Sequence, residues 1–290
     1  MAQSLSRGFY LSFNRLVIYP SIWVAAAIAS LGIYTQEILN LGHNWQAISL
    51  IFVTALIPYN LDRIFDSYVQ QIPDSQAQSF FRQPGIWLLL IGAVVATAVL
   101  LFYAPTEVKY ISIGGIVPLL YGTPLFPRKV ETGWRWYRLK DIPGSKAWIV
   151  GSVLTYAAIA LPLGYAGKGW DNQVALTTLF MFVFIVTNSH IFDVRDIDSD
   201  RDKGVVTLPV MAGVQGTKLI LTAMNLVMLL VIAISWINSI YPFHPEMIAA
   251  VAVNLTYIWL VTPKTPRWVY NIWIEAGLFV PLLLLLAFNI

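Results

Sequence analysis

The chain has 290 residues, of which 58% are hydrophobic and only 11% are charged, and its mean hydropathy is +0.68. Soluble domains carry about 25% charged residues, so this composition excludes an ordinary soluble protein and indicates an integral membrane protein. The chain contains no cysteine, which excludes disulfides, thiolate nucleophiles and cysteine-ligated metal sites.

Hydrophobic runs of roughly 20 residues predict the membrane-spanning elements. In chain order, these runs cover residues 16–35, 45–61, 85–104, 108–126, 146–166, 173–192, 217–240, 246–262 and 268–288. Pro58, Pro118 and Pro162 interrupt three of them, which membrane helices tolerate where neighbouring groups satisfy the freed carbonyls. We therefore expect an all-α integral membrane protein in which nine transmembrane helices form one bundle, with residues 1–290 as a single membrane domain.

The basic residues predict how this bundle is oriented, because cytoplasmic flanks retain Lys and Arg. With a cytoplasmic N-terminus, only Lys109 and Lys168 of the 18 basic residues fall on the outer side. We therefore expect a multi-pass protein whose N-terminus is cytoplasmic. The net charge of +3 then reflects this topology and contact with anionic membrane lipids, and no nucleic acid partner is expected.

The longest polar connections cover residues 62–84, 127–145 and 193–216, and this topology places all three on the cytoplasmic face. Function is therefore expected at the cytoplasmic mouth of the bundle. Two of these connections begin with acidic clusters, at the ends of the second and sixth spans. The first acidic motif contains Asp62 and Asp66, within "YNLDRIFD", and the second contains Asp193, Asp196 and Asp200, within "FDVRDIDSDRDKGVVTLPV".

The spacing within each motif places its carboxylates together if the helix continues through it. Asp62 and Asp66 are four residues apart, and the three residues of the second motif follow an i, i+3, i+7 pattern, so each set shares a helix face. Like charges at these spacings repel, and Mg²⁺, which takes carboxylate and phosphate oxygens as ligands, would compensate them. The alternative is a solvated face whose aspartates pair with Arg63, Arg195 and Arg201.

The second motif resembles that of the UbiA superfamily of intramembrane prenyltransferases. The match consists of the D-x-x-D-x-x-x-D pattern of Asp193, Asp196 and Asp200, followed by Arg201, Gly204 and a Thr-Leu-Pro tail. The first motif is similar in part: Asp62, Arg63 and Asp66 fit the family pattern, whereas Pro58 and Tyr59 occupy the positions of its Asn-Asp pair.

The resemblance implies a Mg²⁺-dependent prenyltransferase that moves an isoprenoid chain from a polyprenyl diphosphate to an aromatic or lipid acceptor. It implies that the five aspartates of the two motifs bind the metal and carry catalysis. Arg63 and Arg201 would support the diphosphate. Further candidate substrate contacts are Asn60, Tyr121, Lys129, Lys140 and Lys146.

Two other functions remain open at this point. An intramembrane terpene cyclase would act on a prenyl diphosphate without an acceptor, and the altered first motif favours it. A non-catalytic lipid-binding or transport protein could retain the same fold. Glu275, inside the last span, is expected to face a cavity or a structural partner, and His190 is expected to pack between helices.

Overall fold

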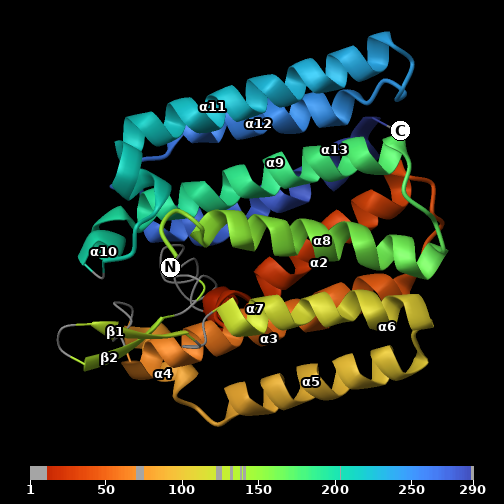
Figure 1. Ribbon diagram of the computed structural model, residues 1–290. Coiled ribbons are helices and arrows are strands. Elements are labelled where there is room, and N and C mark those ends of the chain that lie inside the picture. Colours follow the sequence, from red (N-terminus) through yellow and green to blue (C-terminus); the bar gives the residue numbers. More distant parts are fainter. Residues whose placement is uncertain are drawn as a thin grey trace, which may run out of the picture.

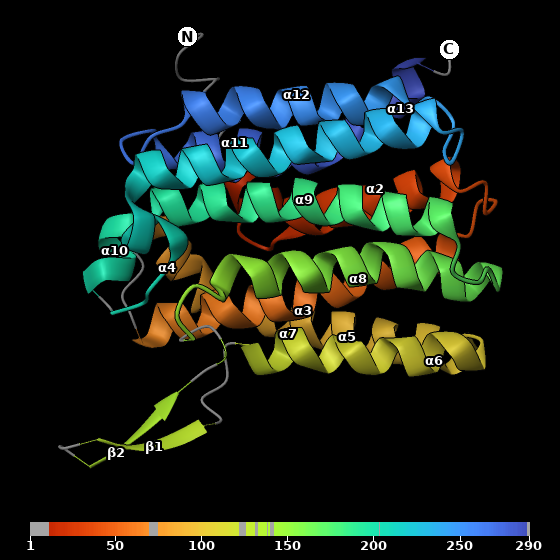
Figure 2. The ribbon, with the colours of Figure 1, turned by 45° about the horizontal axis from the view of Figure 1, so that its top comes forward.

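The computed structural model describes residues 12–69, 75–121, 126–130, 133–137, 139, 142–202 and 204–288. Long helices lie alongside one another in a bundle, and a short β-hairpin projects from one end (Figures 1 and 2). The hairpin pairs β1 (Phe126–Val130) with β2 (Gly133–Tyr137) in antiparallel register. It lies within one of the long polar connections and was not expected from the sequence.

The helical elements follow one another along the chain with short turns between most of them. In order they are η1 (Asn14–Ile18), α2 (Ile22–Ile38), α3 (Trp45–Val69), α4 (Ser75–Phe81), α5 (Gly85–Tyr103), α6 (Thr106–Ser112), η2 (Ile113–Gly115), α7 (Ile116–Tyr121), α8 (Lys146–Ala166), α9 (Asn172–Arg195), α10 (Ile197–Asp202), α11 (Leu208–Ile237), α12 (Pro245–Leu260), η4 (Val269–Ile274), η5 (Gly277–Phe279) and α13 (Val280–Phe288).

Six helices in the described part of the chain are long and apolar enough to cross a membrane. They lie in α3, α5, α8, α9, α11 and the segment Val269–Phe288, and they make this a multi-pass membrane protein. The other three expected spans are α2, of 17 residues, α12, of 16 residues, and a segment that η2 divides between α6 and α7. The helical fold class is therefore confirmed, whereas the count of nine transmembrane helices is not.

Helix α9 is the most enclosed of these six, and the residues it buries include polar ones such as Thr177, Asn188 and Asp193. It packs against α8, α11 and α12, while α2 packs against α3 and α8. The exposed side chains of α5 and α11 are also apolar, as at Leu88 and Leu230, which suits contact with lipid chains. Asp171 caps the start of α9 by accepting a hydrogen bond of 2.8 Å from the backbone N–H of Val174.

The two acidic motifs lie at the same end of the bundle. Figures 1 and 2 show the end of α3, the end of α9, the start of α8, α10 and the hairpin together at this end. The turns between α2 and α3 and between α8 and α9 lie at the opposite end. Which end faces the cytoplasm stays a prediction.

The chain changes direction within the second acidic motif, so this motif does not form one continuous helix. Helix α9 ends at Arg195, and Asp196 leaves helical geometry with φ −94° and ψ 7°. The short helix α10 follows and ends before Gly204, whose φ of 69° is a left-handed conformation that glycine adopts without steric cost. The expectation of a single helix face across Asp193, Asp196 and Asp200 is therefore wrong, because Asp196 interrupts the helix.

Candidate active site

Lys146 lies between two carboxylates of the second acidic motif. Its Nζ is 3.1 Å from Asp193 Oδ1, and it donates hydrogen bonds of 3.1 Å and 3.3 Å to the two oxygens of Asp200. The side chains of Asp193 and Asp200 are only 3% and 9% exposed. The fold therefore directs both carboxylates toward one cationic position at the start of α8.

Arg195 binds the third carboxylate of this motif. Its Nε and Nη2 donate hydrogen bonds of 2.8 Å and 2.7 Å to the two oxygens of Asp196, and its Nη1 donates to Asn271 Oδ1 at 3.2 Å. The guanidinium also lies over the rings of Phe192 and Tyr270. Asp196 is thus linked to the last membrane segment through Arg195, whereas Asp193 and Asp200 are bound by Lys146.

Asp196 and Asp200, which both lie outside the membrane-spanning segments, differ in electrostatic environment. Burial raises the pKa of Asp196, but the hydrogen bonds and charge of Arg195 outweigh it and hold this pKa below the ordinary value. Burial raises the pKa of Asp200 above its ordinary value, even though the Lys146 ammonium acts in the opposite direction. Of the two, Asp196 retains its negative charge to the lower pH.

In the first acidic motif, Arg63 is bound by the protein itself. Its Nη1 donates to the carbonyl of Ile18 at 2.7 Å, and its Nη2 lies 3.9 Å from Glu275 Oε1. Asp62, on the same helix, is partly buried. The side chain of Asp66 falls outside the described part of α3.

The last membrane segment is linked to both motifs. Arg63 of the first motif lies 3.9 Å from Glu275, and Arg195 of the second motif donates a hydrogen bond to Asn271. Glu275 and Asn271 both belong to the segment Val269–Phe288. Helix α7, which ends at Tyr121, packs against α3 and α8.

Three other predicted site residues have no described contact with the aspartates of the second motif. Arg201 extends into solvent with 63% of its side chain exposed, 3.8 Å from Asp198. Lys129 lies in β1, but its side chain is outside the described residues, as is the whole of Lys140.

Asn60 connects α3 to the turn before α2. It is fully buried, donates to the carbonyls of Pro20 and Leu56 at 3.0 Å and 2.8 Å, and accepts from the Ser21 hydroxyl at 3.3 Å. Because both donors of its amide are used within the protein, we leave Asn60 out of the proposed site.

Sequence reasoning missed the contribution of the last membrane segment. The π-helix η4 contributes Tyr270 and Asn271, and its carbonyls of Ile272 and Ile274 accept hydrogen bonds from Trp23 and Asn188. Tyr270 and Asn271 are uncharged, so the sequence did not single them out. The nearby Glu275, an ionisable residue inside a span, was the one signal that this segment contributes to the site. His190 packs against the Trp148 ring at 5.3 Å, in line with the expected packing role.

The donor chemistry at this end fits a hard divalent cation. Carboxylate oxygens are the ligands that Mg²⁺ prefers, and Asp193 and Asp200 already converge on a cation. Asp193 Oδ2 is buried and has no hydrogen-bond partner within the part of the chain that the structure describes, which leaves an acceptor for a cation at the same place. No three acidic, histidine or cysteine side chains among the described residues lie in a ready-made metal-binding group, so a metal would require Lys146 or Arg195 to move.

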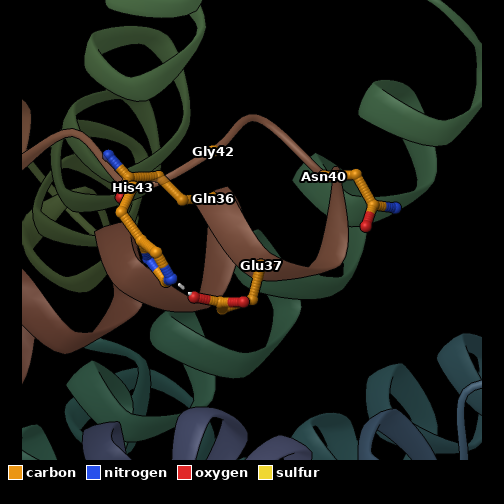
Figure 3. Close-up of a pocket in the computed structure, with 5 residues that line it drawn as sticks. All are labelled: Gln36, Glu37, Asn40, Gly42 and His43. Atoms are coloured by element: carbon orange, nitrogen blue, oxygen red, sulfur yellow. Dashed lines mark ion pairs between the residues drawn. The ribbon is translucent and has the colours of Figure 1, made fainter.

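A surface hollow at the opposite end of the bundle does not offer this chemistry. It is lined by Gln36, Glu37, Asn40, Gly42 and His43, and its ion pair joins Glu37 to His43 at 3.1 Å (Figure 3). A second, apolar groove runs between α2, α3 and the last span. Its lining residues are Ala26, Ala29, Ser30, Ile33, Ile48, Ser49, Phe52, Val53, Phe279 and Leu282.

Comparison with known families gives a match over most of the chain. The sequence model of the UbiA prenyltransferase family matches residues 61–274, which include both acidic motifs. Digeranylgeranylglyceryl phosphate synthase of Haloquadratum walsbyi is 24% identical over 189 residues, which cover 64% of this chain and 54% of that protein. The protein of the same name from Sulfurisphaera tokodaii is 25% identical over 211 residues, which cover 68% of this chain and 66% of that protein. The matched region thus spans less than two thirds of either relative.

The fold also matches a solved structure. A UbiA homologue from Archaeoglobus fulgidus, bound to GPP and Mg²⁺, superposes with a TM-score of 0.64 at 13% sequence identity. The superposition covers 95% of this chain and 98% of that one. At this level of identity, the likeness establishes a shared fold.

Proposed function

This chain belongs to the UbiA prenyltransferase family, and from that membership we propose that it is a Mg²⁺-dependent prenyltransferase acting on a polyprenyl diphosphate within the membrane. The observation that carries the proposal is the convergence of the buried Asp193 and Asp200 carboxylates on one cationic position. Carboxylates alone would repel a diphosphate, so their convergence favours a site that includes a divalent cation.

Each side chain of the site has a proposed task. Asp62, Asp66, Asp193, Asp196 and Asp200 would hold the metal. Mg²⁺ would supply charge stabilisation for the diphosphate leaving group. Tyr121 would donate a hydrogen bond to a diphosphate oxygen, and Arg201, whose side chain on α10 is exposed, would add a cationic contact. Lys129 and Lys140 stay candidate phosphate contacts.

An apolar groove on the bundle offers a surface for the isoprenoid part of the substrate. The groove between α2, α3 and the last span is lined almost entirely by apolar and small side chains, which fit an isoprenoid chain. The two relatives named digeranylgeranylglyceryl phosphate synthase favour a lipid acceptor containing glyceryl phosphate over an aromatic acceptor. We therefore propose a lipid acceptor first and an aromatic one second.

The test is a turnover assay on the purified chain in lipid nanodiscs. GPP and longer prenyl diphosphates are supplied with Mg²⁺, with a glyceryl phosphate lipid, an aromatic quinone precursor or no acceptor. Released diphosphate is quantified, and products are identified by mass spectrometry. Acceptor-dependent release that stops when EDTA is added is the expected result.

The other outcomes identify the alternatives. Acceptor-independent release with a hydrocarbon product would indicate a terpene cyclase, which Pro58 and Tyr59 in the first motif favour. Binding of prenyl diphosphate without release under any condition would indicate a lipid-binding protein. Either result would contradict the transferase.

A further inference from the structure

One ammonium group joins three helical elements at the acidic end of the bundle. Lys146 begins α8, Asp193 lies near the end of α9, and Asp200 lies in α10. The Lys146 Nζ is 3.1 Å from an oxygen of each carboxylate. A single positive charge therefore faces two negative charges and can neutralise only one of them.

These charges are largely withdrawn from water. The side chains of Asp193 and Asp200 are 3% and 9% exposed, and that of Lys146 is 25% exposed. A buried carboxylate without a counter-charge is strongly destabilising, so Lys146 stabilises the fold when no other cation is bound.

Lys146 nevertheless leaves the carboxylates incompletely satisfied. Among the described residues, Asp193 Oδ2 finds no hydrogen-bond partner, and the His190 Nδ1 atom lies 3.6 Å from it. A divalent cation carries two positive charges, so it can neutralise both carboxylates, and it prefers oxygen ligands such as theirs. Lys146 and such a cation would therefore compete for the same oxygens.

We infer that Lys146 is a resident counter-ion of Asp193 and Asp200, which a divalent cation must displace in order to bind. This inference rests on the proposed function, since it takes these aspartates as metal ligands. In this view the Lys146 ammonium and the metal compete for the same two carboxylates. The metal affinity of the wild-type chain is accordingly lower than the carboxylates alone would give.

The first test measures Mn²⁺ binding without any prenyl diphosphate, from the electron paramagnetic resonance signal of free Mn²⁺. The variants are Lys146→Met, which removes the charge, and Lys146→Arg, which keeps it. We expect Lys146→Met to bind Mn²⁺ about tenfold more tightly or better, and Lys146→Arg to bind no more tightly than the wild type. Lys218→Met is the control, since Lys218 is also buried but donates to the carbonyl of Trp259.

The second test measures melting temperatures and adds a variant whose melting temperature should change in the opposite direction to that of Lys146→Met. In EDTA, Lys146→Met should melt below the wild type, and saturating Mg²⁺ should remove the difference. Asp200→Asn leaves one carboxylate for one ammonium, so it should raise the melting temperature in EDTA and lower Mn²⁺ affinity. This second variant keeps the inference testable if Lys146→Met does not fold.

The outcomes separate this inference from the proposed function. If the wild type binds Mn²⁺ and turns over prenyl diphosphate while Lys146→Met binds Mn²⁺ no more tightly, the counter-ion role is wrong and the enzyme assignment stands. A lower melting temperature of Asp200→Asn in EDTA would also overturn it. If neither the wild type nor any variant binds Mn²⁺, the metal-dependent function fails together with the inference.

Discussion

The guanidinium of Arg195 binds the carboxylate of its neighbour Asp196 through two hydrogen bonds, of 2.8 Å and 2.7 Å. This bidentate pair fixes the residue at which α9 ends, and Arg195 in turn contacts Asn271 in the last membrane segment. The second acidic motif is therefore tied to the opposite end of the sequence by a short, directional contact.

Replacing Asp196 with Asn should lower kcat by about 100-fold or more, because a neutral amide is a weaker metal ligand and accepts through one oxygen only. The measurement is diphosphate release at saturating Mg²⁺ and GPP. Asp198→Asn is the matched control, since Asp198 is 86% exposed two residues away. Equal losses of kcat in the two variants would show that removing any negative charge from this region has the effect, so Asp196 would have no special role.

Arg63 and Glu275 should behave as a coupled pair. Glu275 is buried, and Arg63 Nη2 lies 3.9 Å from it, so Arg63→Met leaves a buried carboxylate without this partner and should cost about 2–4 kcal/mol. The double variant Arg63→Met/Glu275→Gln should be at least about 1 kcal/mol more stable than the sum of the single effects predicts. Unfolding of the four proteins in denaturant measures this coupling. Strict additivity would argue against the contact.

Asn60→Ala should reduce stability and leave substrate binding unchanged. The substitution removes two hydrogen bonds to backbone carbonyls and one from Ser21, which together predict a loss of about 1–3 kcal/mol. The KM for the prenyl diphosphate should stay at the wild-type value. A raised KM with unaltered stability would return Asn60 to the substrate site. The assay pairs thermal unfolding with steady-state kinetics.

Asp171 should make the stability of α9 depend on acid pH. Its hydrogen bond from the Val174 N–H, with a smaller effect of Lys168, lowers its pKa below the ordinary value of 3.8. A carboxylate whose pKa is lower in the folded state stabilises the fold fully above its unfolded pKa and loses that contribution as pH falls through the folded value. The melting temperature of Asp171→Ala should therefore lie below the wild type near pH 7 and approach it well below pH 4. A constant difference across this range would contradict the capping role. Glu107→Ala, near the same end of the bundle, serves as the comparison.

The positions of several helices and of the two acidic clusters could be predicted from the sequence alone. A helix that crosses a bilayer must be apolar over a known length, so the runs at 45–61, 85–104, 146–166 and 173–192 predicted helices close to α3, α5, α8 and α9. Aspartates are costly in such a chain, so their concentration at two helix ends singled out the candidate site. The acidic end of the bundle was thus determined before any contact was known.

Tertiary structure decided most of the charge pairs. Spacing placed Asp193, Asp196 and Asp200 on one helix face, whereas the break at Asp196 leaves only the other two to Lys146. Asp196 pairs with its sequence neighbour Arg195, a partner that the sequence had already offered. The other partners are remote in the sequence: Glu275 near Arg63, Asn271 for Arg195 and Lys146 for Asp200. Composition and periodicity describe one segment at a time, while a charge in a low-dielectric bundle is stabilised by whatever side chain packing brings within a few ångströms. For that reason the sequence determined which carboxylates gather at one end of the bundle, and only the packed bundle determined that Lys146 is the counter-ion of Asp193 and Asp200.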